Sequence, residues 1–309
     1  MNKIAITTGD FNGIGPEIII KALNRLCPAK ENIILIGSKV LFDGLNKDYE
    51  IEEIPFKQEW INTGKETKEA GEYAYKCLTK ACELAKNGEI KAIVTAPLSK
   101  NTLHLAGHNF SGQTEVIEKQ LARTQQKAEM LFVSGDFRVL LLTRHLPLKE
   151  IKITKDLLVE KISRINNVLK QNFKIEQPNI ALCALNPHAG ENGILGKEEI
   201  EEFSPAIEEL RQRGIKVTAP MPADTLFVKA AKPYLNKEKQ PYDVYCACYH
   251  DQGLIPIKVL AMDNTVNMTV GLDIIRTSPA HGTAYDIAGK GIADESSMVC
   301  AIREALNIV

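Results

Sequence analysis

The sequence predicts an α/β fold whose sheets are largely parallel. Strand-like and helix-like segments alternate along almost all of the 309 residues. Several of the strand-like segments are short, continuous apolar runs, which is typical of strands buried on both faces. The length suffices for two domains or lobes, and no linker rich in serine or glycine separates them. We therefore expect lobes that are joined by shared strands or helices.

The first part of the chain gives this alternation element by element. Apolar runs predict strands, and apolar residues at helical spacing predict helices. The predicted order is a strand over Lys3–Thr8, a helix near Glu17–Leu26, a strand over Asn32–Ile36, a helix over Thr67–Lys86 and a strand over Lys91–Thr95. Gly37 closes the second strand, and Gly88 is the expected stop of the long helix.

The later part continues in the same way. Strands are predicted over Arg138–Thr143, Asn179–Leu185 and Asp243–Cys248, and amphipathic helices over Lys155–Gln171 and Lys197–Arg213. The polar segment Ala231–Gln240, which Pro233 interrupts, is predicted to be a surface loop. The segment His281–Gly291 is expected to open with a glycine turn and to pass into a short helix.

Composition excludes several classes of partner. The formal net charge is −1 and 25% of the residues are charged, so nothing electrostatic favours nucleic acid or a membrane surface. No apolar stretch approaches the roughly 20 residues needed to span a bilayer, and the start of the chain lacks the pattern of a signal peptide. The seven cysteines include no Cys-x-x-Cys, which indicates buried, reduced thiols in a cytoplasmic protein.

Three of the six histidines share one placement: His145, His188 and His250 each come just after an apolar run predicted to be a strand. In open α/β sheets the ligand crevice lies beyond the carboxyl ends of the strands. Three neutral imidazoles delivered there form a ligand set for a divalent metal that leaves a coordination position open for substrate. Any one of them taken alone is more often a structural histidine. Asp251 either fixes the tautomer of His250 or is only a turn residue.

Two glycine-containing turns are candidate anion sites. Gly9–Glu17 follows the first strand and places Pro16 at a helix start, where backbone N–H groups bind an anion or polar substrate group. It lacks the Gly-x-Gly-x-x-Gly fingerprint of dinucleotide sites, and a plain strand-to-helix turn is the alternative. In Ser111–Glu115, Thr114 either donates to a phosphate or carboxylate or simply caps a helix.

Three polar residues further along lie within or beside apolar segments: Lys258, Asn267 and Arg276. A buried lysine is costly unless it has a partner, so Lys258 is a functional candidate. Arg276 is suited to a bidentate contact with a carboxylate or phosphate. The alternative for each is a side chain at a strand end whose polar tip reaches solvent.

Taken together, these motifs resemble the 4-hydroxythreonine-4-phosphate dehydrogenases of the vitamin B6 pathway, relatives of the isocitrate and isopropylmalate dehydrogenases. The resemblance runs nearly end to end and keeps the family's order. It rests on Gly9-Asp10, Gly13–Glu17, Thr143–Leu148, Leu185–Glu191, Tyr249–Gly253, Val266-Asn267, Ile275–Ser278 and His281–Ala284.

The resemblance implies a two-lobed α/β/α fold like that of isopropylmalate dehydrogenase, with the active site in the interlobe cleft at the interface of a homodimer. The implied first lobe is residues 1–105 plus 285–309, and the second is residues 106–284. His145, His188 and His250 would be metal ligands for zinc, magnesium or cobalt, contributed across the dimer interface. Lys258 is the candidate for the catalytic group near the metal, either transferring a proton or stabilising charge.

The family's other site residues also transfer by position. Substrate-binding residues would be Gln113, Thr114, Lys258, Asn267 and Arg276, and the contacts to NAD or NADP would come from His281, Gly282 and Thr283. Two departures stand out. Asp10-Phe11-Asn12-Gly13 replaces the family's usual Asp-Pro-x-Gly, and Gln113 replaces its usual histidine. Glutamine still forms a hydrogen bond with phosphate but carries no charge.

The implied reaction is oxidation of 4-phosphooxy-L-threonine by NAD⁺ or NADP⁺. The resulting β-keto acid loses CO₂ and gives 3-amino-2-oxopropyl phosphate, a step of pyridoxal phosphate biosynthesis. One alternative is the same chemistry on another phosphorylated hydroxy acid, such as a four-carbon sugar acid phosphate, which Gln113 leaves open. A second is a non-catalytic, metal-bridged dimer that serves as a binding protein.

Overall fold

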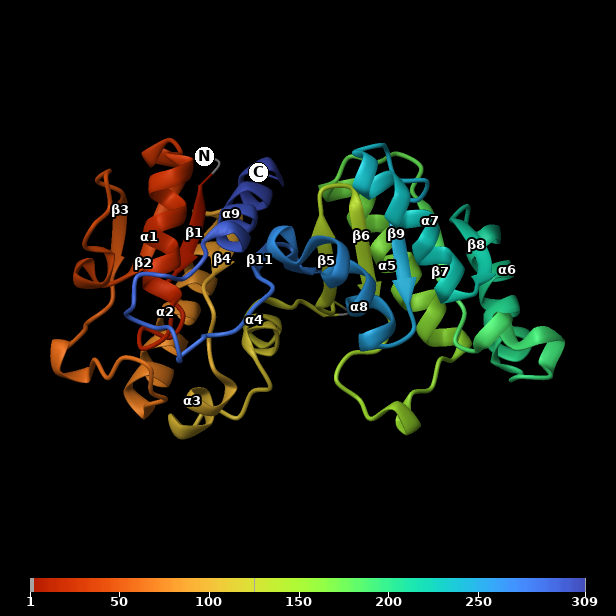
Figure 1. The fold of residues 1–309 in the computed structure, drawn as a ribbon, viewed down its shortest axis with the longest axis horizontal. Helices are drawn as coiled ribbons and strands as arrows, with labels where there is room; N and C mark the ends of the chain where they lie inside the picture. Colours follow the sequence, from red (N-terminus) through yellow and green to blue (C-terminus); the bar gives the residue numbers. More distant parts are fainter. Residues whose placement is uncertain (1–2, 125, 309) are drawn as a thin grey trace. The chain divides into compact units, whose positions relative to one another are not determined.

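Two compact units make up the chain in a computed structural model that describes residues 3–124 and 126–308. One unit combines Met1–Ala128 with Val266–Val309, and the other is Glu129–Thr265. The first unit is discontinuous, and the boundaries expected at 105/106 and 284/285 both fall inside it. Figure 1 shows both units with their elements labelled.

The first unit is built on a sheet with the strand order β3-β2-β1-β4-β11-β10. Neighbouring strands are parallel except β10, which runs antiparallel to β11. The strands are β1 (Ile4–Thr7), β2 (Ile33–Gly37), β3 (Glu50–Glu53), β4 (Ala92–Thr95), β10 (Val266–Val270) and β11 (Ile275–Pro279). The central strands are buried on both faces, which explains their continuous apolar sequence.

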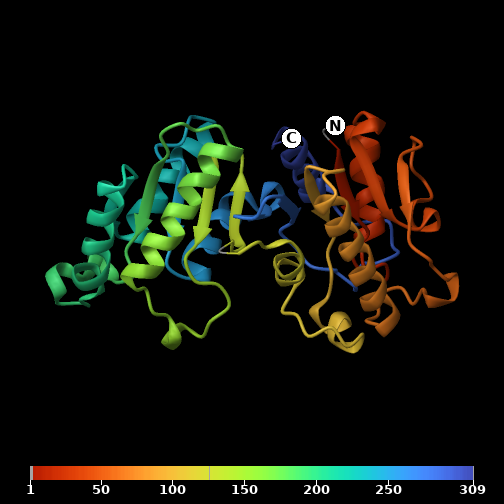
Figure 2. The ribbon, with the colours of Figure 1, turned by 180° about the vertical axis from the view of Figure 1, so that it is seen from behind.

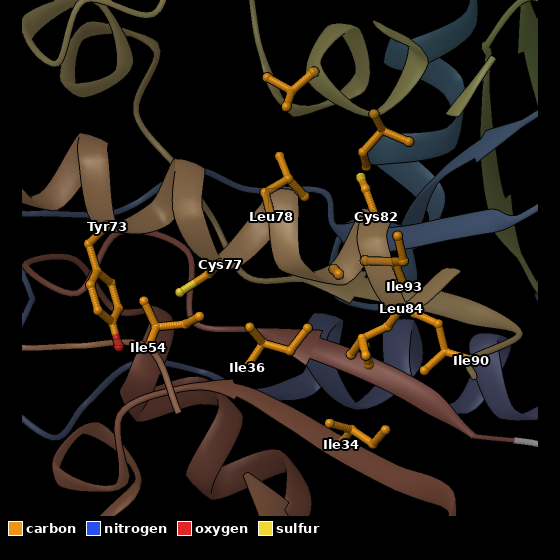
Figure 3. Close-up of a cluster of buried hydrophobic side chains, with 14 of the residues drawn as sticks. Ile34, Ile36, Ile54, Tyr73, Cys77, Leu78, Cys82, Leu84, Ile90 and Ile93 are labelled. Atoms are coloured by element: carbon orange, nitrogen blue, oxygen red, sulfur yellow. The ribbon is translucent and has the colours of Figure 1, made fainter. Parts of the chain in front are cut away.

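Helices cover both faces of this sheet. The helices are α1 (Gly15–Leu26), α2 (Lys68–Lys86), α3 (Lys100–Leu105), α4 (Gln113–Leu121) and α9 (Ser296–Ile308). On one face α1 packs with α9, and on the other α2 packs with α3 and α4. Figure 3 shows the second face, where Tyr73, Cys77 and Leu78 of α2 meet Ile34 and Ile36 of β2. Because side chains alternate along a strand, Leu35, which lies between Ile34 and Ile36, faces the opposite side of the sheet.

The second unit has a sheet with the order β5-β6-β9-β7-β8, in which only the β5–β6 pair is antiparallel. Its strands are β5 (Glu129–Ser134), β6 (Phe137–Leu141), β7 (Asn179–Cys183), β8 (Lys216–Met221) and β9 (Val244–Ala247). Its helices are α5 (Lys155–Asn172), α6 (Ser204–Gln212), α7 (Ala223–Asn236) and α8 (His250–Ala261). Figure 2 shows α5 in front of this sheet, whereas α7 and α8 lie in front of it in Figure 1.

The prediction of an α/β fold with largely parallel sheets is confirmed. Two local predictions are wrong, and one alternative does not apply. Most of Ala231–Gln240 belongs to α7, because Pro233 lies in the last turn and the helix ends only at Asn236. The segment after His281 forms turns without the predicted short helix. The apolar run around Lys258 is part of α8, so this lysine does not lie at a strand end.

No helix in the described part of the chain is both long enough and apolar enough to cross a membrane. The helices are instead amphipathic or short, and they bury one face on a sheet. In α5, for example, Leu158, Ile162 and Ile165 are fully buried, while Lys170 is exposed. This spacing of three to four residues is the pattern that predicted the helix.

Candidate active site

The three predicted metal ligands come from three neighbouring parallel strands of the second unit. β9 lies between β6 and β7 and is parallel to both. His145 follows β6, His188 follows β7, and His250 follows β9, each within a few residues of the strand end. The carboxyl ends of parallel strands share one edge, so the topology brings all three histidine-bearing segments to the same edge of the sheet.

Hydrogen bonds tie these segments to one another. Thr143 donates both its backbone N–H (3.1 Å) and its hydroxyl (2.7 Å) to the carbonyl of Cys248. Gln252 accepts from the Cys248 N–H (2.7 Å) and donates to the Ala184 carbonyl (2.8 Å). The segments that follow β6, β9 and β7 are therefore fixed relative to one another by two side chains.

His145 and His250 are ring neighbours, with centroids 5.4 Å apart. His250 Nδ1 lies 2.7 Å from Asp251 Oδ1, and the His250 side chain is 36% exposed. A proton held on Nδ1 by the carboxylate leaves the Nε2 lone pair free for a metal, the arrangement that commonly orients metal-binding histidines. Asp251 therefore makes the contact needed to fix the tautomer of His250. This is one of the two roles that its position in the sequence left open, the other being that of a turn residue.

His188 lies in an unusual turn, Pro187–Gly193, and is exposed. It does not join the other two in a three-ligand group: within residues 3–124 and 126–308, no three His, Cys, Asp or Glu side chains are grouped to hold a metal ion. The family resemblance distributes the ligands over two chains. The three-histidine site therefore stays a prediction, and the donor chemistry at this edge fits it.

Lys258 lies on α8, eight residues after His250. At about 1.5 Å per residue the two backbone positions are about 12 Å apart along the helix axis. The Lys258 side chain is half-buried, and its ammonium group has no hydrogen-bond or ion-pair partner among the described residues. A partly desolvated, unpaired ammonium is available to a substrate rather than committed to the fold.

Three predicted substrate residues gather in the first unit: Thr114, Asn267 and Arg276. Arg276 pairs across strands with Thr269, and the Thr269 hydroxyl lies 3.3 Å from the Thr114 hydroxyl. Asn267 lies two residues from Thr269 and so faces the same side of the sheet. Its Oδ1 is buried without a hydrogen-bond partner among the described residues. Such an atom in a native protein calls for an explanation, and a bound ligand supplies one.

Arg276 is 4% exposed, yet its guanidinium lacks a carboxylate partner in the described part of the chain. Nε (2.8 Å) and Nη2 (2.6 Å) both donate to the single hydroxyl of Thr95. Burial lowers the pKa of Arg276 to about 10, and the nearby Glu115 opposes this only in part. A buried guanidinium that makes no direct bond to a carboxylate among the described residues is a strong site for a carboxylate or phosphate.

Gln113 begins α4, next to Thr114, and its Nε2 donates to the Ala96 carbonyl at 3.0 Å. The side-chain amide therefore anchors the start of α4 to the end of β4. The helix N-terminus itself follows Gly112, so its free N–H groups add to the positive character near Arg276.

The predicted cofactor segment lies against the first glycine turn. Ile14 N–H donates to the Thr283 carbonyl (3.0 Å), and a Cβ on Gly13 would lie 2.8 Å from that same oxygen. A Cβ on Gly282 would meet nothing within 4 Å, and His281 Nε2 is buried without a partner among the described residues. Open space beside glycine and an unpaired ring nitrogen fit a segment that receives a nucleotide.

A hydrogen-bonded pair beside this segment, the buried Asp10 and the half-buried Tyr285, was not predicted. Asp10 is fully buried, accepts from Asn12 N–H (2.9 Å) and from the Tyr285 hydroxyl (2.6 Å), and has its pKa raised by burial. The same burial, together with this hydrogen bond, raises the pKa of Tyr285. Asp10 and Tyr285 are far apart in sequence, so no local spacing pointed to the contact.

Comparison with known proteins gives one consistent result. A family model described as pyridoxal phosphate biosynthetic protein PdxA matches residues 16–305. A 4-hydroxythreonine-4-phosphate dehydrogenase from Zymomonas mobilis is 39% identical, covering 99% of this chain and 96% of its own. A D-threonate 4-phosphate dehydrogenase from Cupriavidus necator is also 39% identical, with the same coverage of both chains.

Solved structures agree. The 4-hydroxythreonine-4-phosphate dehydrogenase of Klebsiella pneumoniae superposes with a TM-score of 0.87 at 34% identity, covering 99% of this chain and 98% of that one. Isocitrate dehydrogenase from Methylococcus capsulatus, at 15% identity, shares the fold with a TM-score of 0.53, covering 99% of this chain and 85% of that one.

We expect Tyr285→Phe to destabilise the protein more at pH 7 than at pH 4. Removing the hydroxyl takes a hydrogen bond from the charged form of Asp10, so the already raised pKa of Asp10 rises further. A raised carboxyl pKa lowers stability once the pH exceeds the unfolded-state value of about 3.9. Urea unfolding should show a loss of about 1–3 kcal/mol at pH 7 and a smaller one at pH 4.

Tyr49→Phe is the matched control, because the buried Tyr49 hydroxyl has no hydrogen-bond partner among the described residues. Its removal should leave stability nearly unchanged at both pH values. An equal loss for Tyr285→Phe at pH 4 and pH 7 would show that Asp10 does not titrate differently in the variant.

Proposed function

The chain belongs to the family of the pyridoxal phosphate biosynthetic protein PdxA and is a dehydrogenase, and on that premise we propose that it oxidises 4-phosphooxy-L-threonine with NAD⁺ or NADP⁺. The secondary alcohol becomes a ketone, and the β-keto acid loses CO₂ to give 3-amino-2-oxopropyl phosphate. The observation that carries the proposal is the delivery of His145, His188 and His250 to one sheet edge by three neighbouring strands.

The histidines would hold a divalent ion, zinc, magnesium or cobalt. Bound there, the metal would lower the pKa of the substrate alcohol and polarise the ketone before decarboxylation. Asp251 keeps the His250 proton on Nδ1 and so presents Nε2 as the donor atom. Lys258, half-buried and without a partner among the residues that the structure describes, would exchange a proton with the reacting alcohol.

The polar cluster of the first unit would bind the anionic ends of the substrate. Arg276 supplies a buried positive charge and Thr114 a hydroxyl, while Asn267 has a buried carbonyl oxygen free to accept from the substrate. Gln113 contributes a neutral side chain at the start of α4. His281, Gly282 and Thr283 would receive the nucleotide beside the first glycine turn, since the space there is open.

A second substrate deserves equal testing, namely D-threonate 4-phosphate. The chain is equally similar to relatives named for either compound. The two substrates share the phosphate, the carboxylate and the secondary alcohol, and they differ only in an amino or hydroxyl group beside the carboxylate. The neutral Gln113 adds no charge with which to prefer one of them. A non-catalytic, metal-bridged dimer is not supported, because the relatives reported above are enzymes.

We place the enzyme in the cytoplasm, in keeping with its cysteines. All seven are free thiols. Burial raises the pKa of the Cys246 thiol to about 12, so this cysteine stays protonated and inert at neutral pH. Buried, unpaired thiols of this kind are typical of a reducing compartment.

A substrate panel tests the proposed reaction. The purified enzyme, loaded in turn with Zn²⁺, Mg²⁺ or Co²⁺, should reduce NAD⁺ or NADP⁺ with 4-phosphooxy-L-threonine, and the reaction is followed by the ultraviolet absorbance of the reduced nicotinamide. Turnover should disappear after chelation and in His250→Ala, because both remove the metal. Turnover with D-threonate 4-phosphate alone would assign the second substrate, and turnover with neither would refute both.

We expect Lys258→Met to lose about 10²–10⁴-fold in turnover while keeping its unfolding temperature. Methionine retains the length and apolar stem of lysine but has no proton to exchange. Lys170→Met, at an exposed position on α5, is the control and should be fully active. Near-normal turnover in Lys258→Met would remove this residue from the mechanism.

The active enzyme is proposed to be a homodimer. Within one chain, His250 and Lys258 are about 12 Å apart along α8, which favours a site that draws them from two copies. The outer face of α7 and α8 is the candidate interface: it bears a groove of about 420 Å³ between the two helices. Val228 and Val259 on this face are 69% and 80% exposed. Clustered exposed apolar residues of this kind mark interaction sites.

Light scattering should therefore report twice the chain mass at assay concentration, and Val259→Asp should shift it toward the monomer. A charge in an apolar interface costs desolvation without a partner. Val40→Asp, at a 54% exposed apolar residue of the first unit, is the control and should remain dimeric. A fully active monomer would rule out a site shared between chains.

Mixing two inactive variants, His145→Ala and Lys258→Ala, should restore activity under conditions of subunit exchange. If each site takes its histidine from one chain and its lysine from the other, one of the two sites in a mixed dimer has both groups. At random exchange this gives about a quarter of full activity. No recovery, despite demonstrated exchange, would place both residues of a site on one chain.

A further inference from the structure

The turn that carries His188 is a short left-handed helix. Five consecutive residues have positive φ: His188 (52°), Ala189 (54°), Gly190 (78°), Glu191 (42°) and Asn192 (56°). Four of the five are not glycine, and L-residues adopt this conformation at a cost because Cβ crowds the following carbonyl. His188 is also exposed, so burial of its ring does not compensate for the strain. A strained, exposed backbone around a candidate ligand is the kind of outlier that accompanies function.

A buried carboxylate lies directly beneath this turn. Glu199 is 4% exposed. Its Oε1 accepts from the backbone N–H groups of Leu185 (2.9 Å) and Asn186 (2.8 Å), and its Oε2 accepts from the Asn186 side-chain amide (2.9 Å). A Cβ on Gly190 would lie 2.8 Å from Oε2, so the carboxylate also lies against the middle of the left-handed segment.

Glu199 thus binds the backbone immediately before the turn and contacts the turn itself. Asn186 bonds both to the carboxylate and to the turn, since its backbone carbonyl accepts from Ala189 N–H (3.2 Å) at the start of the left-handed segment. The carboxylate comes from a π-helical turn, Glu199–Phe203, an irregular element of the kind that is often found at functional sites. The local strain is therefore opposed by charge-assisted hydrogen bonds to one buried anion.

We propose that Glu199 is a positioning residue that holds the left-handed turn and thereby fixes His188 for metal binding. The role rests on the proposed function only in that His188 is a metal ligand. Glu199 itself does not touch the metal: its two oxygens are occupied by the backbone and by Asn186. It preorganises the ligand, and outer contacts of this kind typically change metal affinity about 10–100-fold.

The test is Glu199→Gln, which keeps the shape but removes the charge and turns one acceptor into a donor facing the Asn186 amide. Zn²⁺ binding to metal-free protein is measured by titration calorimetry. We expect binding to weaken at least about tenfold, while His188→Ala weakens it further. Amide hydrogen exchange of the peptide spanning residues 186–195, measured without metal, should be faster in Glu199→Gln.

Glu202→Gln is the matched control. Glu202 lies on the same π-helical turn and also accepts from a backbone N–H, that of Lys155 (2.6 Å), but at the start of α5. Its substitution should leave both zinc affinity and exchange in the 186–195 peptide unchanged. If Glu199→Gln does not fold, Asn186→Ala is measured in its place; it removes the amide that donates to Glu199 Oε2 and to Glu198 Oε2 and keeps the backbone donors to Glu199 Oε1.

The outcomes separate the two proposals. Unchanged zinc affinity in Glu199→Gln, or an equal loss in Glu202→Gln, overturns the positioning role. No zinc binding by the unchanged chain, or normal binding by His188→Ala, overturns the metal site and the positioning role with it. Weaker binding in both Glu199→Gln and His188→Ala but not in Glu202→Gln, with faster exchange in the 186–195 peptide of Glu199→Gln, supports both.

Discussion

The parallel pairing of β6, β9 and β7 is the constraint on which the candidate site depends. Parallel strands point their carboxyl ends the same way, so residues that follow them meet at one edge however far apart they are in sequence. Gln252 and Thr143 then fix the three following segments to one another. Without this pairing, His145, His188 and His250 would be three unrelated loop residues.

The chain retains polar groups that do not help it fold. Arg276 is buried against a neutral hydroxyl, Asn267 buries a carbonyl oxygen that no described residue satisfies, and the Lys258 ammonium has no partner in the described part of the chain. Each costs stability through desolvation. A phosphorylated substrate with a carboxylate offers the complementary charge, so these costs are offset when it binds. By contrast, Glu129 is buried with Lys161 and Arg164 as partners and has a purely structural explanation.

Division of a site between two chains would also explain why the described part of one chain holds no three-ligand group. The structure brings two of the three predicted ligands together, His145 and His250, and His250 is the first residue of α8. The outer face of α8 carries the exposed Val259 and Ile255, whose burial would provide the hydrophobic energy of association. Assembly and catalysis would then depend on one helix, with ligand, lysine and interface all on α8.

The sequence by itself determined the α/β class, the order of the main elements and the placement of the three histidines after strands. These features depend on local periodicity and on chain direction, and both can be read directly from the order of the residues. The motifs also identified the family. Local signals failed where a residue acts against its immediate context, as in α7, which continues through Pro233 although proline has no N–H to donate to the carbonyl four residues earlier.

Only the tertiary structure decided which distant residues meet. Nothing in the spacing of Asp10 and Tyr285, or of Thr95 and Arg276, indicates their hydrogen bonds, because those contacts form when separate strands and loops pack. The same holds for Glu199 under the His188 turn, where a backbone conformation unfavourable in itself persists because a buried carboxylate binds it. Local sequence sets the cost of such a conformation, and the surrounding fold supplies the interactions that outweigh it.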